Sequence, residues 1–278
     1  MENVNLPQEI EQPQVELLQV SNSESLAALN RSEIDVQIAT AKQYPRNLSQ
    51  VLNNIETLAT LDEKTASDCF YMLRRNGKLI EGPSVRMAEI IASSWGNIRV
   101  QARIIGNDGK MITAQGVCHD LENNYAVSSE VKRRITDKNG KTYTDDMQVV
   151  TGNAACAIAM RNALFKVVPM ALVKKVMDKA KKVSLGESTS LEETRTNMLA
   201  YFQKIGVDEK KIFDYLSVSK IEEIDTDMVV ELRGLANAIN EGTTTVQETF
   251  SPKVEEGNRK VVKPSDDLFK KVEEEEKK

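Results

Sequence analysis

The residues of this chain whose types and spacing could do chemistry are mostly basic, and they lie between residues 74 and 166. The candidates are Arg74, Arg75, Arg99, Arg103, Lys132, Arg133, Arg134, Lys138, Lys141, Arg161 and Lys166, joined by the aromatic ring of Tyr143. Guanidinium and ammonium groups bind phosphates, and flat rings offer surfaces on which bases stack. Tyr71, Trp95 and Tyr125 are further candidates for stacking. The set predicts binding of a single-stranded nucleic acid.

Candidates for catalysis are few. The chain has a single histidine, His119, and it contains no P-loop, no dinucleotide-type glycine pattern and no histidine–cysteine metal cluster. We therefore expect no enzyme activity and no cofactor. The acidic residues Asp137, Asp145 and Asp146 leave one alternative open, a metal-dependent enzyme that processes nucleic acids. A second alternative is a phage structural or scaffold protein that assembles with itself.

The charge of the chain is unevenly distributed. The 278 residues carry a net charge of −5, but residues 31–182 hold 23 Lys and Arg against 16 Asp and Glu, a net of +7 between acidic ends. A basic centre of this kind favours a polyanionic partner. The sequence has no apolar run long enough to cross a membrane, no basic residue among its first 30, and only three scattered cysteines. We expect a cytoplasmic protein, in the host bacterium if a phage encodes it.

Apolar and polar residues alternate over three consecutive segments, 98–105, 111–119 and 125–135, which predicts three strands. Gly106-Asn107-Asp108-Gly109 is typical of a hairpin turn. An alanine-rich helix is expected over 153–168, broken by Pro169, with a basic helix over 171–182. Residues 142–150 could add a fourth strand or a protruding finger. The fold class is α+β, a curved antiparallel sheet of β-hairpins backed by a long helix with flanking helices.

Four parts are expected along the chain: a flexible arm (1–31), the single-strand-binding core (32–182), a small all-α domain (190–242) and a disordered acidic tail (243–278). A helix is expected over 62–75, ended by Asn76-Gly77, and another begins after the N-cap Ser84.

The strand alternation divides the basic residues between two faces. Arg99 and Arg103 share one face of the first strand, and Lys132 and Arg134 point outward from the third. Arg133 must then point inward, where it needs a phosphate or a carboxylate as partner. Arg161 interrupts an apolar helix and is either paired inside the protein or directed at a phosphate.

The order of three hairpin-linked strands followed by an alanine-rich helix with an embedded arginine resembles the phage single-strand annealing proteins of the RecT, Red-beta and Erf type. The closest local likeness is Asn153–Pro169, together with the basic strand Glu130–Arg134. The resemblance implies ATP-independent binding and annealing of single-stranded DNA for phage-type recombination and repair. It also implies assembly into rings or helical filaments, and recruitment through 190–278 of a single-strand-binding protein or an exonuclease. No membrane partner is expected.

Overall fold

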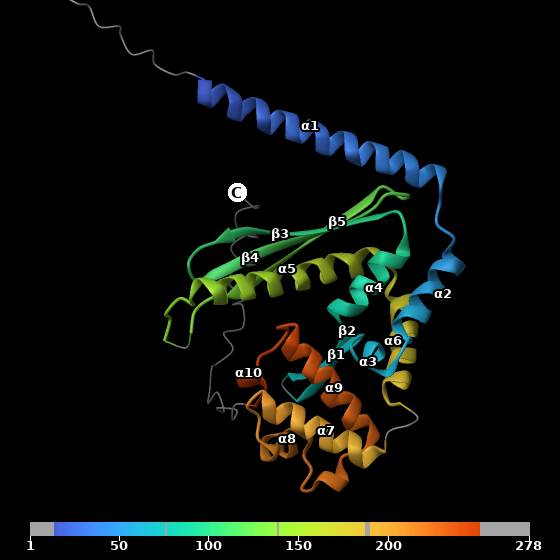
Figure 1. Ribbon diagram of the computed structural model, residues 1–278, viewed down its shortest axis with the longest axis vertical. Coiled ribbons are helices and arrows are strands. Elements are labelled where there is room, and N and C mark those ends of the chain that lie inside the picture. Colours follow the sequence, from blue (N-terminus) through green and yellow to red (C-terminus); the bar gives the residue numbers. More distant parts are fainter. Residues whose placement is uncertain (1–13, 76, 138, 187–189, 251–278) are drawn as a thin grey trace, which may run out of the picture.

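The computed structural model describes residues 14–75, 77–137, 139–186 and 190–250 (Figure 1). The fold is α+β, as predicted. In chain order the elements are α1 (Gln14–Gln43), α2 (Leu48–Ala59), α3 (Glu63–Ser67), β1 (Phe70–Arg75), β2 (Lys78–Pro83), α4 (Val85–Trp95), β3 (Ile98–Asn107), β4 (Met111–Asp120), β5 (Tyr125–Arg134), α5 (Asp145–Val167), α6 (Met170–Ser184), α7 (Leu191–Lys204), α8 (Glu209–Leu216), the 3₁₀ turn η1 (Ile221–Glu223), α9 (Thr226–Asn240) and α10 (Val246–Phe250).

The three predicted strands form an antiparallel sheet in the order β3-β4-β5, with a β-bulge in β3 near Ile104. Helix α5 packs along one face of this sheet (Figure 1). The close approach depends on Gly116, because a Cβ atom there would lie 2.2 Å from the backbone oxygen of Ala159. Ala114, Ala155 and Ala159 complete this tight contact. Small side chains on both elements thus let the helix lie directly against the sheet.

Of the two alternatives for residues 142–150, a fourth strand is not formed. A single bridge, Thr136↔Thr142, closes a short turn. Helix α5 then begins at Asp145 rather than at residue 153. Asp145 and Asp146 lie in the first turn of α5, where the helix dipole favours negative charge. The break at Pro169 is confirmed, since α5 and α6 meet at a bend of 118°.

The helix expected over 62–75 is also wrong. Asp62 caps only the short helix α3, and residues 70–75 form β1 of a hairpin with β2. The burial of β1 explains the difference: Met72 packs in one hydrophobic core and its neighbour Leu73 in another. Consecutive side chains of a strand point to opposite sides, whereas consecutive side chains of a helix are only about 100° apart around its axis. Ser84 does cap α4, accepting a hydrogen bond from the backbone of Met87 at 3.0 Å.

The C-terminal helices α7–α10 form a helical module that shares its core with strand β1. Arg74 of β1 binds both carboxylate oxygens of Glu231 on α9, at 2.5 and 2.8 Å. Gly234 of α9 lets Met72 approach, since a Cβ atom there would lie 2.7 Å from the Met72 backbone nitrogen. The module also extends beyond its expected boundary at residue 242, because Phe250 of α10 packs on Phe202 and Tyr215. The part of the predicted tail from 251 onward lies outside the described residues.

Residues 14–31, expected to belong to a flexible arm, are part of the single long helix α1. Leu29 and Val36 on this helix are 62% and 63% exposed. Helix α1 runs alongside the three-stranded sheet, on the side opposite α5 (Figure 1). No single helix of the described residues is long and apolar enough to span a membrane.

Candidate nucleic-acid interface

The face of the three-stranded sheet opposite α5, here called the outer face, carries the basic residues that the strand alternation predicted to share a surface. Cross-strand register defines its rows: Arg99 lies beside His119, Arg103 beside Gln115, Lys132 beside Thr113, and Arg134 beside Met111. Arg99 and Arg103 lie in the rows nearer the start of β3, whereas Lys132 and Arg134 lie in the rows nearer its end. The four charges therefore form a diagonal stripe across the sheet.

Three of these cations have no carboxylate partner in the described part of the chain. Among the described residues, none forms an ion pair with Arg103, Lys132 or Arg134. Arg103 donates only to the Gln115 side chain, at 3.3 Å. The single acid at an outer-face position of the strands is Glu130. Exposed guanidinium and ammonium groups that lack internal partners can bind phosphate without breaking a contact.

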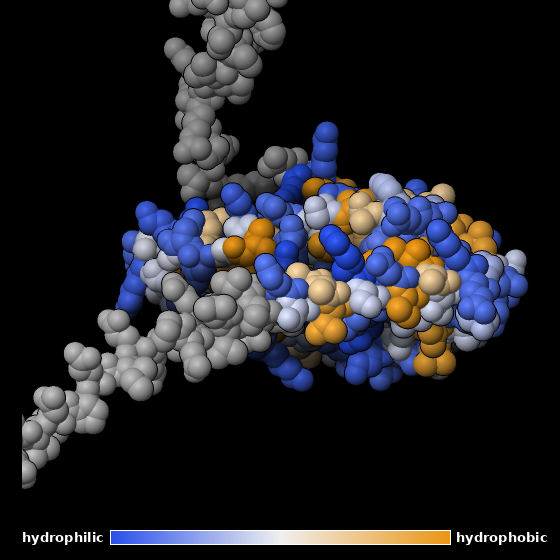
Figure 2. All heavy atoms as spheres, turned by 90° about the horizontal axis from the view of Figure 1, so that it is seen from above, coloured by the Kyte–Doolittle hydropathy of each residue, from blue (hydrophilic) through white to orange (hydrophobic). Residues whose placement is uncertain are grey.

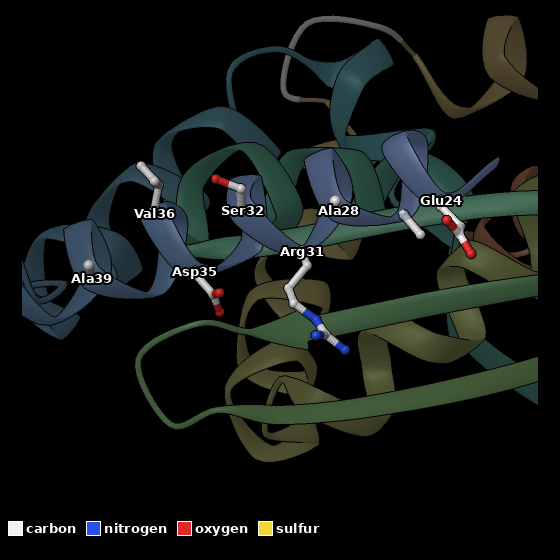
Figure 3. A pocket seen from close by; sticks show the side chains of 8 residues that line it. Glu24, Ala28, Arg31, Ser32, Asp35, Val36 and Ala39 are labelled. Carbon is white, nitrogen blue, oxygen red and sulfur yellow. The ribbon is translucent and has the colours of Figure 1, made fainter. Parts of the chain in front are cut away.

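Helix α1 bounds one end of the outer face. Arg99 donates to the Gln37 side chain at 3.2 Å and lies 3.9 Å from the Glu33 carboxylate. Arg31 projects from α1 on the side of the strands, next to Asp35, as Figure 3 shows. Both belong to a shallow pocket along α1 whose lining residues are Glu24, Ala27, Ala28, Arg31, Ser32, Asp35, Val36 and Ala39. Seen from the side of α1, the surface is largely hydrophilic with several apolar patches (Figure 2).

Two of the predicted site residues, Arg74 and Arg161, are instead paired with carboxylates of the protein, Arg74 at the surface and Arg161 in the interior. The Arg74 guanidinium is held by Glu231, and the hydrogen bond and charge of Glu231 raise the pKa of Arg74. Arg161 is only 6% exposed, lies 3.3 Å from the Glu241 carboxylate and stacks over the ring of Tyr71 at 4.8 Å. Neither residue lies on the outer face of the sheet, so neither contributes to the stripe of cations there. Of the two alternatives that the sequence left open for Arg161, the structure has the internal pair, with Glu241.

Arg133 points inward from β5, as expected. A Cβ atom on Gly242 would lie 3.2 Å from its Nη2 atom, so the guanidinium lies against the end of the helical module. Burial lowers the pKa of Arg133; the charge of Glu248 opposes that effect, and the charge of Arg75 adds to it. No carboxylate of the described residues lies within ion-pair distance of Arg133. Its place beneath the sheet separates it from the stripe on the outer face.

The remaining candidates are dispersed. Arg75 is exposed at the end of β1, Lys141 is exposed in the turn before α5, and Lys166 is exposed near the far end of α5. Tyr143 is half-buried and hydrogen-bonds through its backbone to Ile135. Lys138 lies outside the described residues. None of the four described candidates is brought to the outer face by the strands.

The expected stacking rings are not gathered on the outer face either. Trp95 is 5% exposed and packs beneath the Arg46 guanidinium, at 5.1 Å. Tyr71 lies under Arg161, and the exposed ring of Tyr125 is at the start of β5, on the side of α5 by its register with Asp120. The strands offer phosphate-binding cations on their outer face but no phenylalanine, tyrosine or tryptophan ring there.

Sequence reasoning missed the position of Arg31, because residues 1–31 were expected to form a flexible arm. The uninterrupted helical residues between 24 and 43, without glycine or proline, are the signal that could have extended α1 toward the N-terminus.

The acidic residues considered for metal-dependent catalysis have local roles. The Asp137 carboxylate accepts hydrogen bonds from the backbone of Asn139 and Lys141, both at 2.8 Å, and so fixes the turn before α5. Asp145 and Asp146 begin α5. Within the described residues, no group of three or more His, Cys, Asp and Glu side chains is placed to hold a metal ion.

Comparison of the chain with protein-family models, with curated proteins and with solved structures finds no match in any of the three.

Proposed function

We propose that this chain binds single-stranded DNA on the outer face of its three-stranded sheet and promotes annealing of complementary strands without ATP. The observation that carries the proposal is the diagonal stripe of Arg99, Arg103, Lys132 and Arg134, three of which have no ion-pair partner among the described residues. Neighbouring side chains on one face of a strand are about 6.8 Å apart. The stripe is thus a row of separate cations suited to a flexible polyanion.

The chemistry of the outer face favours contact with the backbone rather than with the bases. Gln101, Thr113, Gln115 and Ser128 supply further hydrogen-bonding groups between the cations. Such contacts hold phosphates without reading sequence. A strand bound in this way keeps its bases available for pairing, which is what annealing requires. The proposal includes phage-type homologous recombination in the cytoplasm and assembly of several copies, as the resemblance to RecT-type proteins implies.

The test is the double variant Lys132→Ala/Arg134→Ala, compared with the wild-type chain by fluorescence anisotropy on a labelled oligonucleotide. Each exposed ion pair contributes about 0.7 kcal/mol, so the loss of two weakens binding roughly tenfold. The slope of log affinity against log salt falls by about 1.4, since each phosphate contact on a single strand contributes about 0.7. Strand pairing should fall in parallel.

The matched control is Lys204→Ala/Lys210→Ala, which removes two exposed lysines from the helical module and should leave binding unchanged. Equal affinity and equal salt slope in the Lys132→Ala/Arg134→Ala variant and the wild type would exclude the outer face as the binding surface.

A further inference from the structure

The two outer strands of the three-stranded sheet both leave a long edge open. The order β3-β4-β5 pairs only one edge of β3 and one edge of β5 within the described residues. Residues 101–105 of β3 are all exposed, and so are most residues of β5. An open edge presents unpaired backbone N–H and C=O groups with which a strand of another chain can pair.

The position of these edges suits repeated stacking. Figure 1 looks down the shortest axis of the molecule and shows the sheet nearly edge-on between α1 and α5. The strands therefore follow one another roughly along the thinnest direction of the protein. A second copy displaced in that direction brings its β3 toward β5 of the first. Because β3 and β5 run in the same direction, this contact is a parallel strand pair.

The side chains of the two edges are complementary when the copies are in register. Arg103, Gln115 and Glu130 form one row across the outer face, with Arg103 at the β3 edge and Glu130 at the β5 edge. Continuing that row into a second copy places the next Arg103 beside Glu130. Neither residue has an ion-pair partner within the described part of the chain. Opposite charges on neighbouring strands stabilise the pairing, and like charges oppose it.

The opposite face of the sheet is complementary in the same register. Ile104, Ala114 and Val131 form the adjoining row on the side of α5. Ile104 is 43% exposed at the β3 edge. In the stacked arrangement, Ile104 of the second copy lies beside Val131 of the first, which removes apolar surface from water.

We propose that β5 of one copy pairs in parallel with β3 of the next, with Glu130 beside the neighbour's Arg103. This contact joins different edges, so it repeats from copy to copy and generates a ring or a filament. The sheets then form one continuous surface on which Arg99, Lys132 and Arg134 recur in every copy. The inference rests on the proposed function, because it specifies the surface through which the copies of that assembly contact one another. Its test requires no DNA.

The first experiment is sedimentation velocity of the full chain over a range of concentrations. The wild type should form assemblies larger than a dimer, and Arg103→Glu or Glu130→Arg alone should raise the concentration needed for assembly at least tenfold. The double variant Arg103→Glu/Glu130→Arg restores the opposite charges and should recover assembly. Lys210→Glu and Asp214→Arg, exposed charge reversals on α8, are the matched controls. A wild type that is monomeric throughout, or reversals without effect, or a double variant as impaired as the single ones, would overturn the proposal.

The second experiment uses cysteines in the row of Gln101, Val117 and Ser128. Within one copy, residues 101 and 128 are two strand spacings, about 9.6 Å, apart, which is too far for a disulfide, whereas between paired copies they are about 4.8 Å apart. Gln101→Cys/Ser128→Cys should give a ladder of disulfide-linked oligomers on mild oxidation. Dimers from Gln101→Cys alone would show pairing of two β3 edges and refute the arrangement. Assembly without DNA binding would instead count against the proposed function and leave this contact intact.

Discussion

The buried pair of Arg161 and Glu241 gives the sharpest test of how the basic residues are divided between structure and binding. Arg161→Met removes the charge and keeps most of the length of the side chain. Arg161 lies on α5, with its side chain 7% exposed, so its position under the sheet predicts a loss of stability without a loss of DNA affinity. The same substitution would have weakened DNA binding if Arg161 contacted a phosphate.

The magnitude follows from the contacts that are lost. Arg161 lies 3.3 Å from Glu241, 3.4 Å from the Thr243 hydroxyl and 4.8 Å from the centre of the Tyr71 ring. Breaking a buried ion pair costs about 3–5 kcal/mol. The lower end applies here, because the second carboxylate oxygen of Glu241 keeps its 2.6 Å hydrogen bond from the backbone of Val85. A loss of about 3 kcal/mol corresponds to a fall in Tm of roughly 6–12 °C for a protein of this size.

The pH dependence of this loss provides an internal control. Burial raises the pKa of Glu241 above its usual value, although the Val85 backbone and the Arg161 charge oppose that effect. The folded protein therefore holds the Glu241 proton more tightly than the unfolded chain does. Without Arg161 the pKa rises further, and acidification through this raised range protonates Glu241 and relieves the unpaired charge. The difference in Tm between Arg161→Met and wild type should shrink as the pH falls from 8 toward 5.

The assay is thermal unfolding by circular dichroism, with oligonucleotide binding measured well below the Tm. Arg161→Met/Glu241→Gln is the companion variant, and it should recover much of the lost stability because no buried charge is left alone. An unchanged Tm combined with a tenfold weaker affinity for DNA would refute the structural role of Arg161 and would show that it contacts DNA.

Further predictions concern the packing of the sheet and its stability in acid. Gly116→Val should lower the free energy of unfolding by about 3 kcal/mol or more in a denaturant titration, because its Cβ atom would overlap the backbone of Ala159; a loss below 1 kcal/mol would contradict the close approach of α5. Burial alone would raise the pKa of Asp120 and of Glu122, but hydrogen bonds, with Arg46 among the donors to both, hold them below their usual values. The stability that the ion pairs of Arg46 with Asp120 and Glu122 provide is fully present above the pKa values that these carboxyl groups have in the unfolded chain. It is lost as the pH falls through their lowered pKa values in the folded protein, so Arg46→Met should lose its effect on Tm in strong acid. An effect of constant size at every pH would argue against the ion pairs.

The alternation of β3 and β5 could be predicted from sequence because it is a local property. Successive residues of a strand point to opposite faces whatever lies elsewhere in the chain. This placed Arg99, Arg103, Lys132 and Arg134 on one face and Arg133 on the other, and the register confirms that division. The division of these basic residues between the two faces of the sheet was thus predictable from the sequence, whereas the cross-strand register that forms the stripe was not.

The partners of the other arginines could not be predicted in the same way. Glu231 is 157 residues from Arg74 in the chain, and Glu241 is 80 residues from Arg161. No local sequence pattern predicts such contacts. The sequence around an arginine that pairs with a distant carboxylate therefore does not differ from the sequence around an arginine that binds phosphate. The prediction for residues 70–75 was wrong for a related reason: the core in which Leu73 packs is formed by residues 202–238, more than a hundred positions further along the chain.

The division of the basic residues also bears on what the protein could do with a bound strand. Proteins that store single strands commonly stack bases on aromatic rings, at about 1–3 kcal/mol for each base. Here the strand positions of the outer face offer cations, amides and hydroxyls, while Trp95 and Tyr71 are covered by Arg46 and Arg161 inside the protein. The bases of a strand that is held only through its phosphates do not stack on the protein. No base–protein stacking energy is therefore lost when the strand pairs with its complement. Release into a duplex would then cost only salt-sensitive contacts, which is the energetic condition for annealing without ATP.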